Sequence, residues 1–192
     1  MKFVLDYDVK HIRENGTFTV LECEKSHLIP QMRLGDAVFN FFYKPDRVDR
    51  LENGVVRLID YKTGSEETQF SSLDNLFVEG SKKRCSGILQ LLLYCYAYLT
   101  ENPSVKQVMP VIYRLGQMQS SGVWVAAKAK GEPASQYVFS MDDELAKAFV
   151  TRMAGTIGAI YQNDFTQASP KSSRCNYCRF VDFCRRSPKK FN

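Results

Sequence analysis

The chain has 192 residues, 44% hydrophobic and 24% charged, which is ordinary for one soluble globular domain with a sizeable core. Its net charge of +5 is compatible with a polyanionic partner but does not require one. Only two histidines are present, which disfavours histidine-based hydrolases and zinc proteases of the His-Glu-x-x-His kind. Residues 1–10 lack the apolar core of a signal peptide, and the apolar stretch 87–99 is too short to span a bilayer. We therefore expect a cytoplasmic protein with no membrane partner.

Hydrophobic patterning predicts strands at residues 18–24, 37–51 and 55–63, and the last two are joined by the hairpin signal Glu52-Asn53-Gly54. Residues 64–80 are polar and predict a loop. The following elements are a helix at 83–99, a buried strand at 108–115, a short strand at 123–127 and a helix from 141 to about 163. This order predicts an α/β fold with a mixed central sheet, built around an antiparallel hairpin and flanked by helices. We assign residues 1–167 to one domain and residues 168–192 to a cysteine-rich tail, entered through a short linker at 168–173.

Two carboxylates and a lysine lie on the two strands of the predicted hairpin. Asp60 and Lys62 are two residues apart on the second strand, and Asp46 lies on the first. Carboxylates so placed can hold a divalent metal, and the lysine can stabilise the charge that builds on a phosphate under attack by water. An Asp-x-Lys on a strand alone would most often be a solvated face, so the argument depends on Asp46 lying beside Asp60.

The hairpin loop decides whether Asp46 and Asp60 share a face of the sheet. A two-residue loop would place them on opposite faces, whereas a three-residue loop with Gly54 in the left-handed conformation sets Asp46 opposite Asp60. The three-residue loop also opposes Asp49 to Arg57, a favourable cross-strand pair. We therefore predict the three-residue loop.

The helix at 83–99 carries a polar pair, Gln90 and Tyr94, four residues apart and therefore on one face. They lie away from the apolar stripe of Ile88, Leu91, Leu92, Cys95 and Leu99. The plain interpretation is a solvent-facing glutamine and an amphipathic tyrosine. If this face turns towards the carboxylates, the two side chains can hydrogen-bond a phosphate or a water on the metal.

Three segments resemble, in order and spacing, motifs of the RecB-like branch of the PD-(D/E)XK nuclease superfamily. They are Tyr-Lys-Pro-Asp-Arg-Val-Asp at 43–49, Asp-Tyr-Lys-Thr-Gly at 60–64 and Gln-Leu-Leu-Leu-Tyr at 90–94. The resemblance spans residues 18–184 and implies a restriction-endonuclease-like core. It makes Asp46 and Asp60 ligands of Mg²⁺ or Mn²⁺ and Lys62 the catalytic lysine, with Gln90 and Tyr94 supporting substrate or metal.

The same resemblance gives roles to other acidic residues. It implies that Asp49 braces its strand rather than binding metal. Glu24 lies where many relatives carry a glutamate ahead of the hairpin, and it is a candidate third metal ligand. Glu22 is nearby, and the sequence leaves the choice between the two open.

Cys175, Cys178 and Cys184 form a Cys-x2-Cys-x5-Cys run in the tail. The run resembles the C-terminal three-cysteine segment that binds a [4Fe-4S] cluster in AddB-type subunits, where the fourth cysteine lies upstream. The resemblance thus implies a [4Fe-4S] cluster in the complete protein. Zinc is the alternative occupant, because thiolate sites bind it readily. Cys23 is an imperfect candidate for the upstream cysteine.

The chain departs from the family pattern near its start. Residues 1–15 suggest the middle of a domain, so the usual upstream helices, cysteine and catalytic histidine are not expected, and His27 is an imperfect substitute for the histidine. Tyr43 replaces the usual glycine. A fragment of a longer protein and a trimmed variant with reduced activity both fit, and we favour the fragment.

The leading interpretation is a metal-dependent DNA nuclease, with exonuclease activity preferred, that acts in recombinational repair or DNA processing. Its expected partners are DNA and a helicase subunit or fused helicase region, because the chain has no phosphate-binding motif of an ATP-driven motor. One alternative is a non-catalytic DNA-binding or scaffold module with a cysteine-bound metal staple. A zinc-binding interaction domain is a weaker one, because it leaves the acidic hairpin unexplained.

Overall fold

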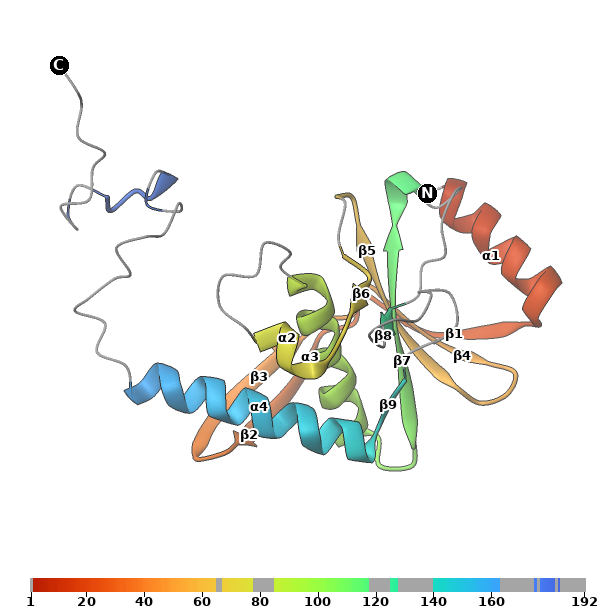
Figure 1. Ribbon diagram of the computed structural model, residues 1–192. Helices are drawn as coiled ribbons and strands as arrows, with labels where there is room; N and C mark the ends of the chain where they lie inside the picture. Colours follow the sequence, from red (N-terminus) through yellow and green to blue (C-terminus); the bar gives the residue numbers. More distant parts are fainter. Residues whose placement is uncertain are drawn as a thin grey trace, which may run out of the picture. The chain divides into compact units, whose positions relative to one another are not determined.

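The computed structural model describes residues 2–64, 67–77, 85–117, 125–127, 140–162, 175, 177–181 and 183. The chain divides into two compact units, Met1–Gly158 and Ala159–Asn192. The first unit contains the sheets and the helices that pack on them (Figure 1). In the described part of the chain, no helix combines the length and the apolar character needed to cross a membrane.

The elements follow one another as a helix, five strands, and then a mixture of helices and further strands. The strands are β1 (Phe18–Cys23), β2 (His27–Leu34), β3 (Ala37–Tyr43), β4 (Arg47–Leu51), β5 (Val56–Lys62), β6 (Gln69–Phe70), β7 (Gln107–Arg114), β8 (Ala126–Ala127) and β9 (Met141–Asp142). The helices are α1 (Lys2–Asn15), α2 (Leu73–Phe77), α3 (Ser86–Glu101), the 3-10 turn η1 (Leu115–Gln117) and α4 (Asp143–Gln162).

A five-stranded sheet in the order β1-β4-β5-β7-β9 forms the centre of the first unit. Strands β5 and β7 pair in parallel, while β1–β4, β4–β5 and β7–β9 are antiparallel. Strands β2–β3 and β6–β8 form two further two-stranded sheets. The predicted mixed sheet around an antiparallel hairpin is therefore confirmed.

The two faces of the central sheet are covered by different helices. Val56 and Leu58 of β5 pack with Ile88 and Leu92 of α3 in the main apolar core. Ile59 of β5 lies in a separate cluster that includes side chains of α1. Alternate residues of β5 thus face α3 and α1, and Figure 1 shows these two helices on opposite sides of the sheet.

The hairpin of β4 and β5 closes through the three-residue loop that the sequence predicts. The N–H of Leu51 donates to the carbonyl of Val55 at 2.9 Å, and Gly54 has a φ of +85°. Asp49 pairs with Arg57 in the strand register. All three observations confirm the predicted loop and register.

Helix α3 confirms the predicted helix at 83–99, although it begins at Ser86 and ends at Glu101. The predicted apolar stripe consists of Ile88, Leu91, Leu92, Cys95 and Leu99, each at most 9% exposed. Burial alone raises the pKa of the Cys95 thiol, which therefore remains protonated and packs as a small apolar group. Strand β7 likewise confirms the predicted buried strand at 108–115.

The prediction of one continuous strand over 37–51 was wrong. The structure divides it into β3 and β4, separated by Lys44, Pro45 and Asp46, which belong to no strand. Pro45 has no N–H to give to a strand ladder, so the chain leaves the β2–β3 ribbon here and enters the central sheet. Strand β2, which the sequence analysis did not place, pairs with β3 across an irregularity between Ile29 and Met32.

Three other predictions need correction. The sequence analysis expected no helix before the first strand, but α1 occupies Lys2–Asn15. The predicted loop at 64–80 contains β6 and α2. The predicted helix from residue 141 begins only at Asp143, because Met141 and Asp142 form β9 against β7. The predicted linker at 168–173 lies outside the described residues.

Candidate active site

Asp46 and Asp60 meet where β4 begins and β5 nears its end. Arg47 pairs with Ile59, and continuing this antiparallel register by one step sets Asp46 opposite Asp60. The Asp46 carboxylate accepts a hydrogen bond of 2.6 Å from the N–H of Tyr61, the residue that follows Asp60. This bond holds Asp46 against the partner strand, on the side of the sheet that α3 covers.

Lys62 lies two residues after Asp60 and therefore on the same face of β5. Its Nζ is 3.0 Å from Oδ2 of Asp60 and donates to Oε1 of Gln90 at 3.2 Å. The side chains of Lys62 and Asp60 are 24% and 11% exposed, so the pair is shielded but reachable from solvent. The lysine thus places a positive charge beside the carboxylates.

Helix α3 contributes the polar pair that the sequence singled out. Nε2 of Gln90 donates to the hydroxyl of Tyr94 at 3.0 Å. Because Gln90 accepts from Lys62 through its other amide atom, the hydrogen bonds run in one direction, from Lys62 to Gln90 to Tyr94. The hydroxyl proton of Tyr94 is not used by either bond. Asp60, Lys62, Gln90 and Tyr94 are thus joined in one chain of polar contacts.

The structure keeps Glu24 apart from this chain of contacts. Its backbone N–H donates to the carbonyl of Asp46 at 3.0 Å, but its side chain is 73% exposed and pairs with Lys44 at 3.0 Å. Glu22 accepts hydrogen bonds from Lys25 and His27. Burial acts to raise the pKa of Glu22, but these two bonds outweigh it and the net effect is a lowered pKa.

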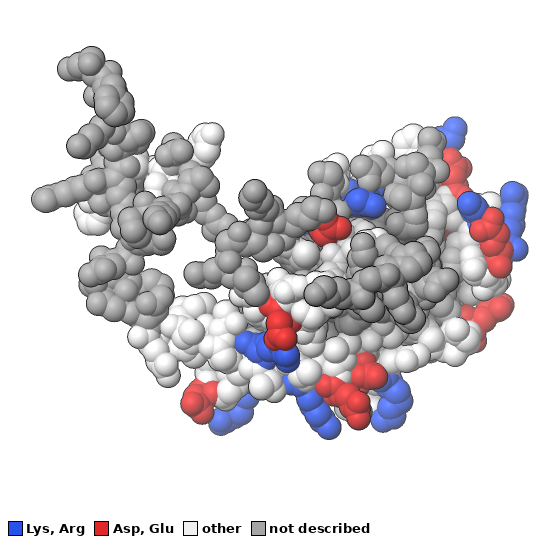
Figure 2. Space-filling view, in the orientation of Figure 1, with Lys and Arg blue, Asp and Glu red and all other residues white. Residues whose placement is uncertain are grey.

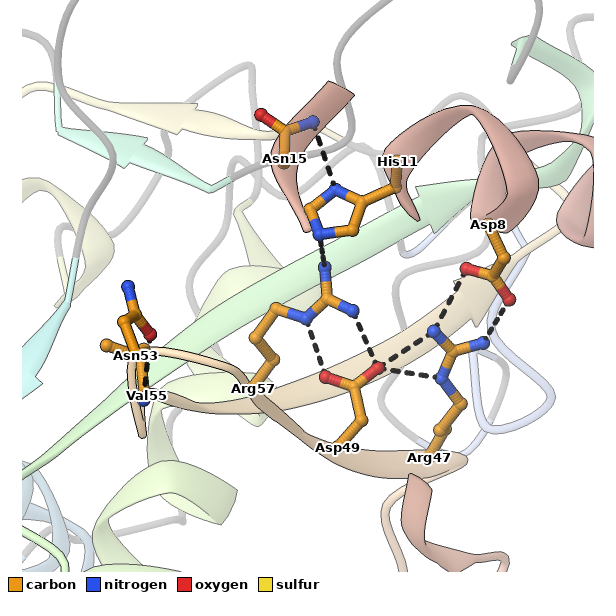
Figure 3. A network of polar contacts seen from close by, with 8 residues as sticks. All are labelled: Asp8, His11, Asn15, Arg47, Asp49, Asn53, Val55 and Arg57. Atoms are coloured by element: carbon orange, nitrogen blue, oxygen red, sulfur yellow. Dashed lines mark hydrogen bonds and ion pairs between the residues drawn. The ribbon is translucent and has the colours of Figure 1, made fainter. Parts of the chain in front are cut away.

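A buried polar network lies on the opposite face of the same strands, and Figure 3 shows it from close by. Both terminal nitrogens of Arg47 donate to Asp8 of α1, at 2.6 and 3.0 Å. Arg47 also donates to Asp49 from Nε at 3.0 Å and from a terminal nitrogen at 2.8 Å, and Arg57 donates to the same carboxylate. Asp49 therefore braces β4 and β5, as its resemblance to the family motif implies.

Burial makes the charges of this network interdependent. Arg47 and Arg57 are 5% and 0% exposed. Their guanidinium carbons lie 5.0 and 5.1 Å, respectively, from the centroid of the Phe18 ring. Burial acts to lower the pKa of Arg47, but the hydrogen bonds that Arg47 donates to Asp8 and Asp49 dominate and raise it. The pKa of His11 is lowered by burial and then by Arg57, so His11 is neutral at pH 7. The roles of Asp8, Arg47 and His11 in this network were not predicted from the sequence.

The candidate metal ligands fit a magnesium-type ion. Among the described residues, no three His, Cys, Asp or Glu side chains gather into a possible metal site, so Glu24 does not complete a set with Asp46 and Asp60. Mg²⁺ is commonly held by one or two carboxylates together with waters and substrate phosphates. The carboxylates of Asp46 and Asp60 meet that requirement, and their hard oxygen donors favour Mg²⁺ or Mn²⁺ over softer metals.

The tail cysteines are only partly described. Cys175 and Cys178 are free thiols, and the N–H of Cys178 donates to the carbonyl of Cys175 at 3.2 Å. This bond closes the Cys-x2-Cys turn. Cys184 lies outside the described residues. Cys23 is a free and exposed thiol on β1.

The distribution of surface charge does not by itself locate a nucleic-acid-binding surface. On the face shown in Figure 2, the basic and acidic side chains of the coloured residues are interspersed rather than gathered by sign. Recognition of a polyanion on this face would therefore depend on local groups rather than on a broad positive field.

Comparisons with known proteins identify a family. The family described as PD-(D/E)XK nuclease superfamily matches residues 2–185. A search of curated proteins gives no match. A solved structure described as "Crystal structure of SSO0001" is 14% identical in sequence, with a TM-score of 0.37. The match covers 98% of this chain and 69% of the chain in that structure. At that TM-score the likeness carries no argument about fold or function.

Proposed function

This chain belongs to the PD-(D/E)XK nuclease superfamily, whose members are generally metal-dependent nucleases, and we propose that it is a Mg²⁺- or Mn²⁺-dependent deoxyribonuclease. The observation that carries the proposal is the continuous set of contacts from Asp60 to Lys62 to Gln90. Asp46 is held beside this set by its hydrogen bond from the N–H of Tyr61. A site that had lost its catalytic activity would have no physical need to keep these groups together. Phosphodiester hydrolysis is the reaction that uses all of them.

Each residue has a distinct task in this reaction. Asp46 and Asp60 would hold the divalent ion, which would supply Lewis-acid charge and make water a better nucleophile at neutral pH. Lys62 orients the attacking water or stabilises the negative charge that develops on the phosphate. Gln90 fixes the Lys62 ammonium through the 3.2 Å hydrogen bond, and the hydroxyl proton of Tyr94, which neither bond uses, can be donated to substrate.

The RecB-like motifs support a more specific assignment within the superfamily. We infer an exonuclease of recombinational repair or DNA processing that works with a helicase subunit or a fused helicase region. The support is the match in order and spacing of the segments at 43–49, 60–64 and 90–94. The one clear departure within them is Tyr43 in place of glycine.

The tail supports a second, separate proposal. We infer that Cys175, Cys178 and Cys184 supply three thiolates to a [4Fe-4S] cluster, with zinc as the alternative occupant. The hydrogen-bonded turn at Cys175 and Cys178 is compatible with both sulfurs approaching one centre. Anaerobic purification, visible absorption and metal analysis distinguish the two occupants. A colourless protein with one equivalent of zinc would exclude the cluster, and a protein with neither metal would exclude both.

A cleavage assay tests the proposed activity. Linear single-stranded and double-stranded DNA should be degraded with Mg²⁺ or Mn²⁺ and should remain intact with EDTA. The double variant Asp46→Asn/Asp60→Asn, purified in parallel, should be inactive and so exclude a contaminating nuclease. Equal degradation in EDTA, or by the double variant, would contradict the proposal. Metal-independent DNA binding without cleavage would favour the alternative, a non-catalytic DNA-binding or scaffold module.

A further inference from the structure

Tyr43, which ends β3, is buried beside the catalytic side of α3. It is 2% exposed, and its ring centroid is 5.7 Å from that of Tyr94, with the two planes at 49°. Tyr94 accepts the hydrogen bond from Gln90, and Gln90 accepts the one from Lys62. The ring of Tyr43 is therefore next to the far end of the polar chain that begins at Asp60.

Tyr43 is itself held on two sides. Its hydroxyl donates to Glu101 at the end of α3, and its ring stacks on that of His27 at 4.6 Å and 22°. Burial first, and then the bond to Glu101, raises the pKa of Tyr43, so the hydroxyl remains a donor throughout the neutral range. The position of this ring is thus set by contacts outside the candidate active site.

His27 secures this arrangement to two further elements. Its Nε2 is 2.8 Å from Glu22 of β1, and its Nδ1 is 3.2 Å from Glu101 of α3. The imidazole is therefore bracketed by two carboxylates, and the side chain is only 10% exposed. These contacts tie the β2–β3 ribbon to the edge strand of the central sheet and to α3.

We propose that Tyr43 is a positioning residue, which fixes the ring of Tyr94 and through it the Gln90–Lys62 pair, and that Glu101 and His27 hold Tyr43 in place. Tyr43 lies three residues before Asp46, so the same ring also anchors the segment that delivers the first carboxylate. This inference rests on the proposed nuclease function. It gives a physical role to the one residue that departs from the RecB-like motifs.

A double-mutant cycle on the full chain tests whether Tyr43 acts through Tyr94. Tyr43→Leu removes the ring and should lower the single-turnover cleavage rate about tenfold, with DNA affinity in Ca²⁺ or EDTA unchanged. In a Tyr94→Leu background, the same substitution should cause little further loss. Phe149→Leu, in the main core on α4, is the matched control, and its effect should be the same in both backgrounds.

Tyr43→Phe keeps the inference testable if Tyr43→Leu does not fold, because it preserves the ring and removes only the hydroxyl that donates to Glu101. It should lower the cleavage rate a few-fold in the wild-type background and not at all in Tyr94→Leu. Losses that add in both backgrounds, or a loss in DNA affinity instead of rate, would overturn the positioning role. A wild-type protein that does not cleave DNA would instead contradict the proposed function, so the two failures are distinguishable.

Discussion

Arg57 donates two hydrogen bonds to the carboxylate of Asp49 across β4 and β5, from Nε at 2.6 Å and from a terminal nitrogen at 2.8 Å. This pair lies on the α1 side of the sheet, but it fixes the register of the hairpin on both sides. The same register sets Asp46 opposite Asp60 on the α3 side. The structural brace and the candidate metal ligands are therefore two consequences of one strand alignment.

The carboxylate of Asp60 should be essential for metal binding. Asp60→Asn keeps the size of the side chain but removes its negative charge, so titration calorimetry with Mn²⁺ should show at least a tenfold weaker affinity, together with loss of cleavage. Asp36→Asn, an exposed position in the β2–β3 turn, is the control and should bind Mn²⁺ as the wild type does. Unchanged affinity in Asp60→Asn would remove Asp60 from the metal site.

The hairpin loop should depend on the glycine at its end. Gly54 has a φ of +85°, and a Cβ there would have no atom within 4 Å, so Gly54→Ala introduces backbone strain without a clash. We expect urea denaturation to show a loss of about 1 kcal/mol. Gly155→Ala, in the α4 helix and also without a close atom, should instead leave stability unchanged or raise it. Equal effects of the two substitutions would argue against the three-residue loop.

The buried network should require Asp8 to balance its two arginines. Asp8→Asn leaves Arg47 and Arg57 to share the single charge of Asp49 in a buried setting, so we expect a loss of roughly 3 kcal/mol in the free energy of unfolding. Asp6→Asn, exposed on the same helix, should change it by less than about 0.5 kcal/mol. A small effect of Asp8→Asn would mean that α1 is not anchored by this ion pair.

The hairpin and its candidate site could be predicted from the sequence because the information is local. Glu52-Asn53-Gly54 defines the loop, and alternation along the strands then places Asp46, Asp60 and Lys62 together. Helix α1 could not be predicted by apolar periodicity, because its buried positions are polar: Asp8 and His11. Their partners Arg47 and Arg57 lie far along the chain, and only the tertiary fold brings them together.

Strand β2 was missed for a different physical reason. Pro30 and the irregularity between Ile29 and Met32 interrupt the two-residue alternation that marks a strand. The split of β3 from β4 was also missed, although Lys44, Pro45 and Asp46 interrupt the apolar run of β3 before Val48. The ribbon in which Tyr43 is held was therefore not predicted.

Stability should decline in mildly acidic solution because of His11. Burial and the neighbouring Arg57 lower its pKa in the folded state, and Arg47 acts the same way, while Asp49 and Asp8 act in the opposite direction. The unfolded chain, with a histidine pKa near 6.5, therefore takes up a proton more readily, so this contribution is complete above that pH and is lost as the pH falls below it. Urea denaturation between pH 7.5 and about 5 should show the decline, and His11→Gln should flatten it. An equally steep decline in His11→Gln would assign the effect to other groups.

Lys62 should be required for turnover but not for binding DNA. Its ammonium lies 3.0 Å from Asp60 and 3.2 Å from Gln90, where it can act on a phosphate only after that phosphate has reached the carboxylates. Lys62→Met retains the length of the side chain and removes the charge, so we expect the single-turnover rate to fall by about two orders of magnitude or more, as for loss of one charge-stabilising donor. DNA affinity measured in Ca²⁺ should change less than about threefold, because many backbone contacts contribute to it. Lys147→Ala on the exposed side of α4 is the matched control and should retain full activity. A Lys62→Met protein that cleaves at the wild-type rate would remove the lysine from the chemistry, and one that no longer binds DNA would make it a binding residue.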